Sequence, residues 1–318
     1  MDKKNSNFFI TGGAGFIGSH LVDRLLNKKQ NKVTVFDNLA NGDRKHISIH
    51  ESNPNFKFIE ADLNNIKQLK SSMRGHDIVF HFAANTDNRN EIDLPTDLQI
   101  KENIQNTYNV LESMRLNNII KIVFPSSSTI YGDSKKAFSE SYGPLLPISL
   151  YGASKLTGEA FISSFHFLFG INAWIFRFSN IVGSRMNHGV IFDFIEKLSD
   201  DPTTLEILGD GEQRKPFVHV DECIDAIFHS LSSVKEGINV FNIGCAKSTC
   251  IKDIGKMVAQ EMGLTNVEYK FTGGSKGWIN DVPVLKFNVN KLKKLGWSTR
   301  LTSDQAVINS IKDLLNEK

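Results

Sequence analysis

The chain has 318 residues, 40% of them hydrophobic and 23% charged, and its 37 basic and 35 acidic side chains leave a formal charge of +2. This length corresponds to about two domains, and the balance of residue types excludes an intrinsically disordered chain. A nearly neutral chain also gives no general reason to expect nucleic acid or an anionic membrane as a partner.

The sequence carries no signal for a membrane, for secretion or for a metal site. No apolar run approaches the roughly 18 residues needed to span a bilayer. Residues 1–7 are polar and lack the apolar stretch of a signal peptide. The three cysteines, Cys223, Cys245 and Cys250, form no C-x-x-C pair and are expected to be reduced thiols. These features predict a cytoplasmic protein.

In the first half of the chain, short apolar runs alternate with longer amphipathic stretches. Strands are predicted at 8–11, 32–36, 56–60, 77–82, 119–125 and 173–178. Helices are predicted near 16–28, 64–74, 97–116 and 150–169. Such alternation predicts an α/β fold, a doubly wound parallel sheet of the Rossmann type with helices on both faces.

After residue 178 the regular alternation ends. Glycine-rich loops occur at 208–213 and 271–278, and shorter helices are predicted at 189–199, 221–233, 251–262 and 303–316. We therefore expect a first domain over 1–178, with a segment near 215–245 returning to it. A smaller α/β domain is expected to occupy most of 179–318.

Three glycines lie between the first predicted strand and helix, in a G-x-x-G-x-x-G pattern formed by Gly12, Gly15 and Gly18. Glycine there permits a tight turn and a close approach to a pyrophosphate at the helix N-terminus. The next apolar run ends in Asp37, whose carboxylate is placed to bind the adenosine ribose hydroxyls and to repel a 2′-phosphate. NAD is therefore favoured over NADP. Arg44 and Lys45 could weaken this preference but are expected to face solvent.

Two further predicted strands end in residues suited to a bound cofactor. In an open parallel sheet, ligands bind at the carboxyl ends of the strands. Asp62 is a candidate contact of the adenine amine, and the small side chains of Ala83 and Ala84 leave room for the cofactor. His81, which is flanked by apolar residues, is interpreted as a packed histidine and not as a catalyst.

A tyrosine and a lysine begin the predicted helix at 150–169. Tyr151 and Lys155 are four residues apart and share one helix face. An ammonium beside a phenol stabilises the phenolate, and a positive nicotinamide adds to this, so the pair can bring the tyrosine pKa down toward working pH. This arrangement predicts a general base. The preceding strand ends in serine hydroxyls, Ser126, Ser127 and Ser128, at the same rim of the sheet.

These motifs resemble the extended short-chain dehydrogenase/reductase family, in its nucleotide-sugar epimerase and dehydratase branch. The likeness runs along nearly the whole chain, through 11–18, 37–39, 61–63, 81–84, 103, 126–132, 151–155, 177–180, 209–221 and 280–283. The resemblance implies that the catalytic hydroxyl lies four residues before Tyr131, at Ser127, with Ser126 and Ser128 as alternatives. The cofactor contacts that it implies are Gly12, Gly15, Phe16, Ile17, Gly18, Asp37, Asn38, Asp62, Leu63, Phe82, Ala83, Ala84, Asn103, Tyr151, Lys155 and Phe178.

The resemblance also implies a mechanism. Tyr151 removes the proton from the sugar 4-hydroxyl while hydride leaves C4 for NAD, and Ser127 hydrogen-bonds the same oxygen. Lys155 holds the nicotinamide ribose and lowers the pKa of Tyr151. In a 4-epimerase the keto sugar then turns over in the site and takes the hydride back on its other face.

The residues after Ser127 separate the reactions of this branch. Dehydratases of the family carry Asp-Glu there to eliminate water, and decarboxylating relatives carry a Glu at the second position. This chain has Ser128 and Thr129, neither of which is an acid–base group near pH 7. The substitution favours epimerisation, or simple oxidation at C4.

The second half resembles the part of the family that binds a nucleoside-diphosphate sugar. Arg214 and Lys215 take the Thr and Arg places of a segment that often reads Gln-Thr-Arg-Asp-Phe, which leaves open which cation reaches the diphosphate. Lys276 or Trp278 stands where the family often has an arginine. The candidate substrate residues are Ser127, Ser128, Asn180, Val190, Arg214, Lys215, Lys276, Trp278 and Asp281. Uridine diphosphate is the commonest carrier among the relatives, but neither base nor sugar is defined.

The resemblance and two apolar helices, at 97–116 and 150–169, predict a homodimer with a four-helix interface. Candidate contacts are Tyr108, Leu111, Met114, Phe161, Phe165 and Phe169, and the alternative for several of them is that they face the sheet. Two other functions remain as alternatives. A net oxidoreductase that releases a C4-keto or reduced sugar would need external NAD(H). A non-catalytic NAD-binding protein would typically lack the Tyr/Lys pair.

Overall fold

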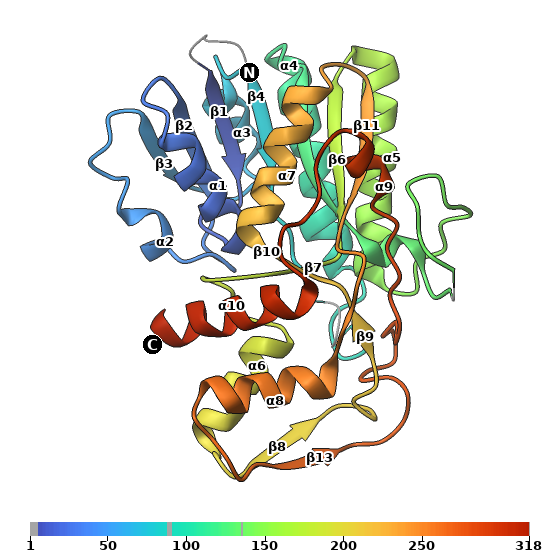
Figure 1. Ribbon diagram of the computed structural model, residues 1–318. Helices are drawn as coiled ribbons and strands as arrows, with labels where there is room; N and C mark the ends of the chain where they lie inside the picture. The colour runs from blue at the N-terminus through green and yellow to red at the C-terminus, as the bar shows by residue number, and fades with distance from the viewer. Residues whose placement is uncertain (1–5, 88–90, 135, 318) are drawn as a thin grey trace. The chain divides into compact units, whose positions relative to one another are not determined.

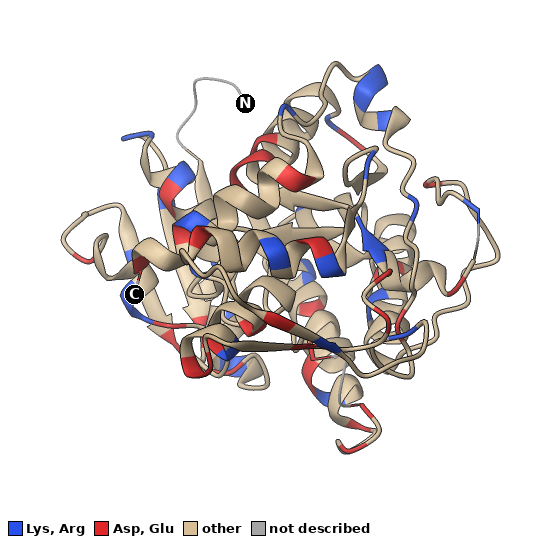
Figure 2. Cartoon of the chain, turned by 60° about the horizontal axis from the view of Figure 1, so that its bottom comes forward, with Lys and Arg blue, Asp and Glu red and all other residues tan. Residues whose placement is uncertain are grey.

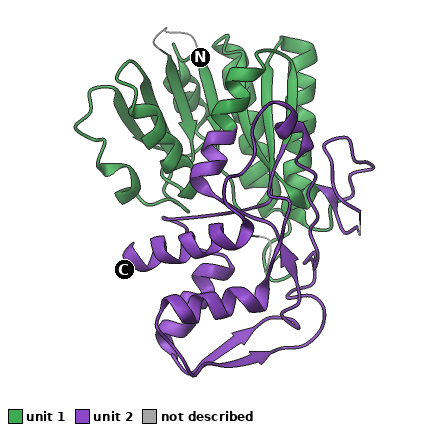
Figure 3. Ribbon diagram, viewed as in Figure 1, with its two compact units in different colours: residues 1–130, 147–177, 227–241 green, residues 131–146, 178–226, 242–318 purple. Residues whose placement is uncertain are grey.

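The computed structural model of the chain describes residues 6–87, 91–134 and 136–317. Residues 1–5 of the polar N-terminal segment lie outside the described residues. The chain divides into two compact units (Figure 3). Unit 1 consists of Met1–Ile130, Pro147–Arg177 and Ile227–Phe241. Unit 2 consists of Tyr131–Leu146, Phe178–Ala226 and Asn242–Lys318.

Unit 1 is built on a sheet with the strand order β11-β6-β5-β4-β1-β2-β3 (Figure 1). The strands are β1 (Asn7–Thr11), β2 (Lys32–Asp37), β3 (Phe56–Glu60), β4 (Ile78–His81), β5 (Lys121–Ser127), β6 (Asn172–Phe178) and β11 (Ile238–Ile243). Strand β1 pairs in parallel with β2 on one side and β4 on the other, so the chain winds outward from the centre in both directions. This is the Rossmann-type doubly wound sheet predicted from the sequence.

Helices cover both faces of this sheet. The helices that follow the strands are α1 (Phe16–Leu26), α2 (Lys45–Ser48), α3 (Ile66–Met73), α4 (Gln105–Leu116) and α5 (Leu150–Phe169). Helix α4 contacts both α3 and α5, which places these three helices along one face. The helix predicted at 97–116 is divided, because a π-helix at Ile100–Ile104 precedes α4. The short α2 begins at Lys45, next to Arg44, and both side chains are exposed as predicted.

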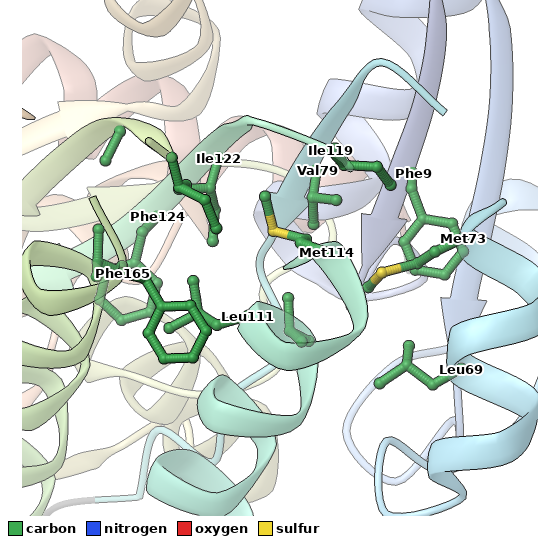
Figure 4. Packing of buried hydrophobic residues seen from close by; sticks show 14 of the residues in the cluster. Phe9, Leu69, Met73, Val79, Leu111, Met114, Ile119, Ile122, Phe124 and Phe165 are labelled. Carbon is green, nitrogen blue, oxygen red and sulfur yellow. The ribbon is translucent and has the colours of Figure 1, made fainter. Parts of the chain in front are cut away.

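A hydrophobic cluster fills the space between the sheet and helices α3, α4 and α5. Figure 4 shows Leu111 of α4 beside Phe165 of α5, and Met73 of α3 beside Phe9 of β1. Met114 belongs to the same cluster and, like Leu111, is fully buried. Leu111, Met114 and Phe165 therefore face the sheet, which is the alternative that the sequence left open for several of the candidate subunit contacts. Among the other candidates, Tyr108 is 40% exposed and Phe169 is 43% exposed.

The segment Tyr131–Leu146 belongs to unit 2, although the sequence analysis placed it in the first domain. Aromatic packing explains the difference. The Tyr131 ring stacks on Phe138 with 4.7 Å between centroids, and its edge meets Phe287. The Tyr131 hydroxyl also donates a hydrogen bond of 2.7 Å to Asn242 Oδ1. Phe287 and Asn242 lie far away in sequence, so no local pattern could reveal these two contacts.

Unit 2 consists of helices and of strands in short pairs. The pairs are β7 (Asn180–Val182) with β10 (Phe217–His219), β8 (Thr204–Ile207) with β13 (Glu268–Phe271), and β9 (Arg214–Lys215) with β12 (Thr249–Cys250). Helices α6 (Val190–Asp200), α8 (Ile251–Glu261) and α10 (Ser303–Glu317) pack on one another, and α9 (Asn290–Lys294) is a single turn. Helix α7 (Val220–Ser233) starts in unit 2 and ends in unit 1.

Within the described part of the chain, no helix has both the length and the apolar character needed to cross a membrane. The same residues contain no cluster of His, Cys, Asp and Glu side chains that could hold a metal ion. Cys223, Cys245 and Cys250 are free and buried. Burial raises the pKa of the Cys223 thiol, which makes it a structural thiol and not a nucleophile. Basic and acidic residues are interspersed along the ribbon (Figure 2).

Candidate active site

The loop between β1 and α1 leaves no room for side chains at two of its glycines. Gly12 has a positive φ of 71°, and a Cβ atom there would lie 2.4 Å from the backbone nitrogen of Ala83. A Cβ on Gly18 would lie 2.1 Å from the carbonyl oxygen of Gly12. Helix α1 starts after Gly15 with no side-chain cap and no acidic residue in its first turn. Its first amide groups can therefore bind an anion.

Asp37, the last residue of β2, lies directly beside this loop. Its carboxylate accepts hydrogen bonds of 2.9 Å from the backbone amides of Ala14 and Leu39. Burial raises the pKa of Asp37, and these two hydrogen bonds act against the rise. Asn38 donates a 2.9 Å hydrogen bond to Asp62, which joins the ends of β2 and β3. The carboxylate thus sits at the strand end where an adenosine ribose would bind.

The other predicted cofactor residues line the ends of the neighbouring strands. Phe82, Ala83 and Ala84 follow β4, and the Ala83 amide donates to the Thr11 hydroxyl at 3.3 Å. His81 is buried and its ring bonds the hydroxyls of Thr11 and Thr107, at 2.7 and 3.1 Å. Burial lowers the pKa of His81 to about 3, so it stays neutral. This agrees with its interpretation as a packed histidine.

Asn103 joins three segments of unit 1. It lies in the π-helix, a rare conformation that often marks functional sites. Its Oδ1 accepts a hydrogen bond of 2.8 Å from the Asn85 amide, after β4. Its Nδ2 donates to the Asn85 carbonyl oxygen at 2.9 Å and to the Ser154 hydroxyl at 3.1 Å on α5. Asn103 therefore fixes the strand-end loop against the helix that carries Tyr151.

Helix α5 brings Tyr151 and Lys155 together, as the four-residue spacing predicts. The helix begins after Ser149, whose hydroxyl accepts a 2.9 Å hydrogen bond from the Gly152 amide. The Lys155 ammonium is buried, donates a 3.0 Å hydrogen bond to the Pro125 carbonyl oxygen, and lies 5.8 Å from the centre of the Tyr151 ring. Burial lowers the pKa of Lys155 to about 8.

Burial dominates the electrostatics around the phenol in the protein without cofactor. The pKa of Tyr151 is raised to about 12, mainly because burial disfavours the phenolate, while a hydrogen bond with Ser127 acts in the opposite direction. The reason is desolvation, which penalises the phenolate and the ammonium alike. The prediction that Lys155 and a positive nicotinamide together lower this pKa concerns the protein with its cofactor bound, and it stays a prediction.

The three serines at the end of β5 have distinct surroundings. Ser127 hydrogen-bonds Tyr151, and its hydroxyl accepts hydrogen bonds from the Thr129 amide and hydroxyl at 3.2 and 2.9 Å. The Ser126 hydroxyl is buried and has no hydrogen-bond partner within the described residues. Ser128 begins a short 3-10 helix at Ser128–Tyr131. The geometry thus brings Ser127 to the phenol.

Two carboxylates that contact α5 or lie on it were not predicted from the sequence. Glu91 accepts hydrogen bonds from the amides of Leu150 and Tyr151, at 2.9 and 2.6 Å, where it balances the positive end of the helix dipole. Glu159 forms a buried bidentate pair with Arg177 of β6, with distances of 3.0 and 2.7 Å. The four-residue step from Lys155 to Glu159 was a possible signal for the second carboxylate. Nothing local indicated Glu91.

In unit 2, the structure separates the two candidate cations. Lys215 Nζ lies 2.5 Å from Asp281 Oδ1, contacts the Val282 carbonyl oxygen, and sits 5.8 Å from the centre of the Trp278 ring. Burial lowers the pKa of Lys215, and Asp281 opposes this effect. Successive residues of a strand point to opposite faces, so Arg214 is directed away from this group. The structure therefore gathers Lys215, Trp278 and Asp281 but not Arg214.

The remaining substrate candidates also lie in unit 2. Asn180 starts β7, and its Nδ2 donates a 3.3 Å hydrogen bond to the Pro216 carbonyl oxygen. Val190 is the first residue of α6. The Lys276 ammonium is 3.4 Å from Asp133. Phe178, a predicted cofactor contact, ends β6 and is buried.

The residues of unit 1 fit a dinucleotide. Side-chain-free backbone at Gly12 and Gly18, the uncapped start of α1 and the carboxylate of Asp37 match a pyrophosphate and an adenosine ribose in that order. The unpartnered hydroxyl of Ser126 is a further polar group at this rim. The Tyr151, Lys155 and Ser127 side chains supply proton-transfer groups at the same end of the sheet.

Comparisons with known proteins agree with this geometry. The family model described as "NAD dependent epimerase/dehydratase family" matches residues 8–244. The chain is 33% identical to a "Putative UDP-glucose 4-epimerase" of Methanocaldococcus jannaschii, over 94% of this chain and 95% of the other. A crystal structure of UDP-galactose 4-epimerase is 35% identical, with a TM-score of 0.86 over 98% and 99% of the two chains. A UDP-N-acetyl-alpha-D-glucosaminuronate decarboxylase of Bacillus cytotoxicus is 30% identical, over 90% of each chain.

Proposed function

This chain belongs to the NAD dependent epimerase/dehydratase family, and from that membership we propose that it is a 4-epimerase, which inverts C4 of a nucleoside-diphosphate sugar without net redox change. NAD is its cofactor, and when bound it accepts a hydride from the sugar and returns it. Relatives in this family include both 4-epimerases and decarboxylases, so the family alone does not select the reaction.

The residues beside Ser127 carry the choice of reaction. A dehydratase or decarboxylase needs an acid–base group next to the sugar, and the chain has Ser128 and Thr129 at the positions where such relatives carry carboxylates. The Thr129 hydroxyl donates its hydrogen bond to Ser127 at 2.9 Å, so it serves the catalytic serine. The aliphatic hydroxyls of Ser128 and Thr129, unlike a carboxyl group, cannot act as a general acid near pH 7. This observation supports inversion over elimination or decarboxylation.

The proposed roles follow from the contacts in unit 1. Tyr151 accepts the proton of the sugar 4-hydroxyl, and Ser127, hydrogen-bonded to Tyr151, binds the same oxygen. Lys155 has a pKa of about 8 and is mostly protonated at pH 7, so its positive charge favours the phenolate form of Tyr151. Burial raises the pKa of Tyr151 in the protein without cofactor, so the charges of Lys155 and of a bound nicotinamide would have to offset this effect of burial.

We assign binding of the diphosphate to unit 2 and to Lys215 in preference to Arg214. Lys215 stands in the place of the family arginine and lies with Trp278 and Asp281, two other substrate candidates. We also propose a homodimer and a cytoplasmic location. Exposed Phe167 and Leu168, at 80% and 71%, support an apolar contact surface on α5, and the free buried cysteines suit a reducing compartment. A strict monomer at micromolar concentration in sedimentation would refute the dimer.

The reaction is tested with the pure protein and a panel of nucleotide sugars, followed by NMR without added cofactor. The expected result is interconversion of two C4 epimers. A substrate labelled with deuterium at C4 should keep its label at C4 in the product, because the hydride returns within the site. Label in free NADH, or accumulation of a 4-keto sugar, would establish a net oxidoreductase instead. Absence of any conversion, with NAD still bound, would favour a non-catalytic protein.

A further inference from the structure

Unit 2 contains an open cleft of about 540 Å³ that none of the proposed catalytic steps uses. It forms where three short segments meet. Strand β9 pairs with β12 on one side, and on the other side Arg214 forms an isolated bridge with Val284. Residues 245–248, from the loop between β11 and β12, also line the cleft, and so does the buried Phe287.

Three cations line this cleft. Arg214, Lys247 and Lys286 come from the three different segments, and all three are exposed. No Asp or Glu is among the residues that line the cleft, and within the described residues none of these three cations has an ion-pair partner. Other basic residues of unit 2 do have one, such as Lys252 with Glu212 and Lys197 with Glu206. The positive charge is therefore concentrated in the cleft, although the chain as a whole is nearly neutral.

The cleft is distinct from the group around Lys215. Arg214 and Lys215 are adjacent on one strand and point to opposite faces. The Lys215 side chain is only 13% exposed and is paired with Asp281, whereas Arg214 contributes its side chain to the cleft. A ligand of the cleft would therefore not replace the diphosphate that we assign to Lys215.

We propose that this cleft is a second binding site, which takes an anion with two or more phosphoryl groups. Like charges held together on a concave surface focus the electrostatic potential and attract a multivalent anion. The planar guanidinium of Arg214 matches two phosphate oxygens, and the two lysines add charge without a fixed geometry. A free inorganic polyphosphate and the phosphates of a nucleotide offer the same chemistry.

The test is calorimetric titration of the full chain with inorganic pyrophosphate in the presence of saturating NAD and UDP, which block other phosphate sites. We expect binding that weakens as sodium chloride is raised, because the cations are exposed. The double variant Lys247→Gln/Lys286→Gln should weaken binding by on the order of tenfold or more. The control Lys28→Gln/Lys29→Gln removes the same charge from exposed residues of unit 1 and should change binding less than about twofold.

Three results would overturn the proposal: no heat of binding at millimolar pyrophosphate, binding that disappears when NAD and UDP are added, or equal affinity in the double variant and in the control. If the double variant does not fold, the single exposed replacement Lys286→Gln decides the matter, with about threefold weaker binding expected. A parallel titration with ADP distinguishes the two sources. Tighter binding of ADP than of pyrophosphate would indicate a nucleotide, and equal binding a free polyphosphate.

Discussion

Two buried lysines show how differently the two units treat a positive charge. Among the described residues, Lys155 of unit 1 has no carboxylate as an ion-pair partner; it donates to the Pro125 carbonyl oxygen, and burial lowers its pKa to about 8. Lys215 of unit 2 is also largely enclosed, but Asp281 at 2.5 Å opposes the effect of burial on its pKa. A buried lysine without a counterion therefore loses its charge nearer to neutral pH than a lysine beside a carboxylate does. Lys155 still carries its charge at pH 7, where it favours the phenolate, and Lys215 holds its charge beside a carboxylate.

The largest loss of activity should follow from removing the phenol of Tyr151, which lies next to Lys155. Tyr151→Phe keeps the ring but deletes the proton acceptor, so turnover should fall by at least about 10³. NAD affinity, measured by calorimetry, should stay within a few fold, since the glycine loop and Asp37 are untouched. Turnover at a tenth of the original rate or more would show that Tyr151 is not the general base. It would also contradict the role proposed for Lys155.

Ser127→Ala removes a hydroxyl that touches the phenol, and its effect should be smaller. We expect a loss of about 10² in kcat with little change in NAD affinity. Ser128→Ala is the matched control, because its hydroxyl lies one residue further along the chain, and it should retain most activity. If the control is inactive and Ser127→Ala is active, the register of the strand end is wrong.

In unit 2 the role of the ion pair is tested by removing the counterion of Lys215. Asp281→Asn leaves the Lys215 ammonium enclosed without a charged partner, so the free energy of unfolding in urea should fall by about 3 kcal/mol. The double variant Lys215→Met/Asp281→Leu should recover part of this loss, because both charges leave together. An equal free energy of unfolding in the single and double variants would show that side-chain packing, and not the ion pair, stabilises this region.

The pH dependence of stability sharpens the contrast between the lysines. The folded-state pKa of Lys155, about 8, lies below the ordinary lysine value of 10.5, so the unfolded chain binds more protons between these values and stability rises with pH there. The slope should approach about 1 kcal/mol per pH unit and be largely lost in Lys155→Met. Lys215→Met should flatten the curve less, because Asp281 opposes the shift. Urea unfolding between pH 8 and pH 10 measures both.

The smallest effect concerns the choice of cofactor. Asp37→Asn removes the negative charge but keeps an oxygen for the Ala14 or Leu39 amide. The preference for NAD over NADP in calorimetry should narrow by about tenfold, because the repulsion of a 2′-phosphate is lost. Equal binding of the two cofactors by the unchanged protein would contradict the role given to Asp37.

Local patterns predicted much of unit 1. The period of apolar residues placed strand 56–60 and helix 150–169 at the bounds that β3 and α5 have in the structure. The same reasoning missed β9 and β12, because strands of two residues contain no period. It also left open whether Leu111 and Met114 face the sheet or another subunit, because an apolar helix face has the same sequence pattern in both cases.

The candidate site was predictable where residues lie close in sequence, as with Tyr151 and Lys155. The pairing of Lys215 with Asp281, or of Glu91 with the start of α5, joins distant segments and leaves no trace in spacing. The raised pKa of Tyr151 depends on burial, which sequence does not give. The roles of the individual site residues stay predictions until the variants are measured.

The position of edge strand β11 in the sequence has a consequence for folding during synthesis. It is the hydrogen-bonded neighbour of β6 in the sheet, yet the chain between them, from Ser179 to Gly237, includes much of unit 2. On the ribosome, at roughly 5–20 residues per second, β6 would therefore wait several seconds with an open edge before its partner is made. Open edges invite pairing with other chains. A chaperone that binds nascent strands would act during that interval.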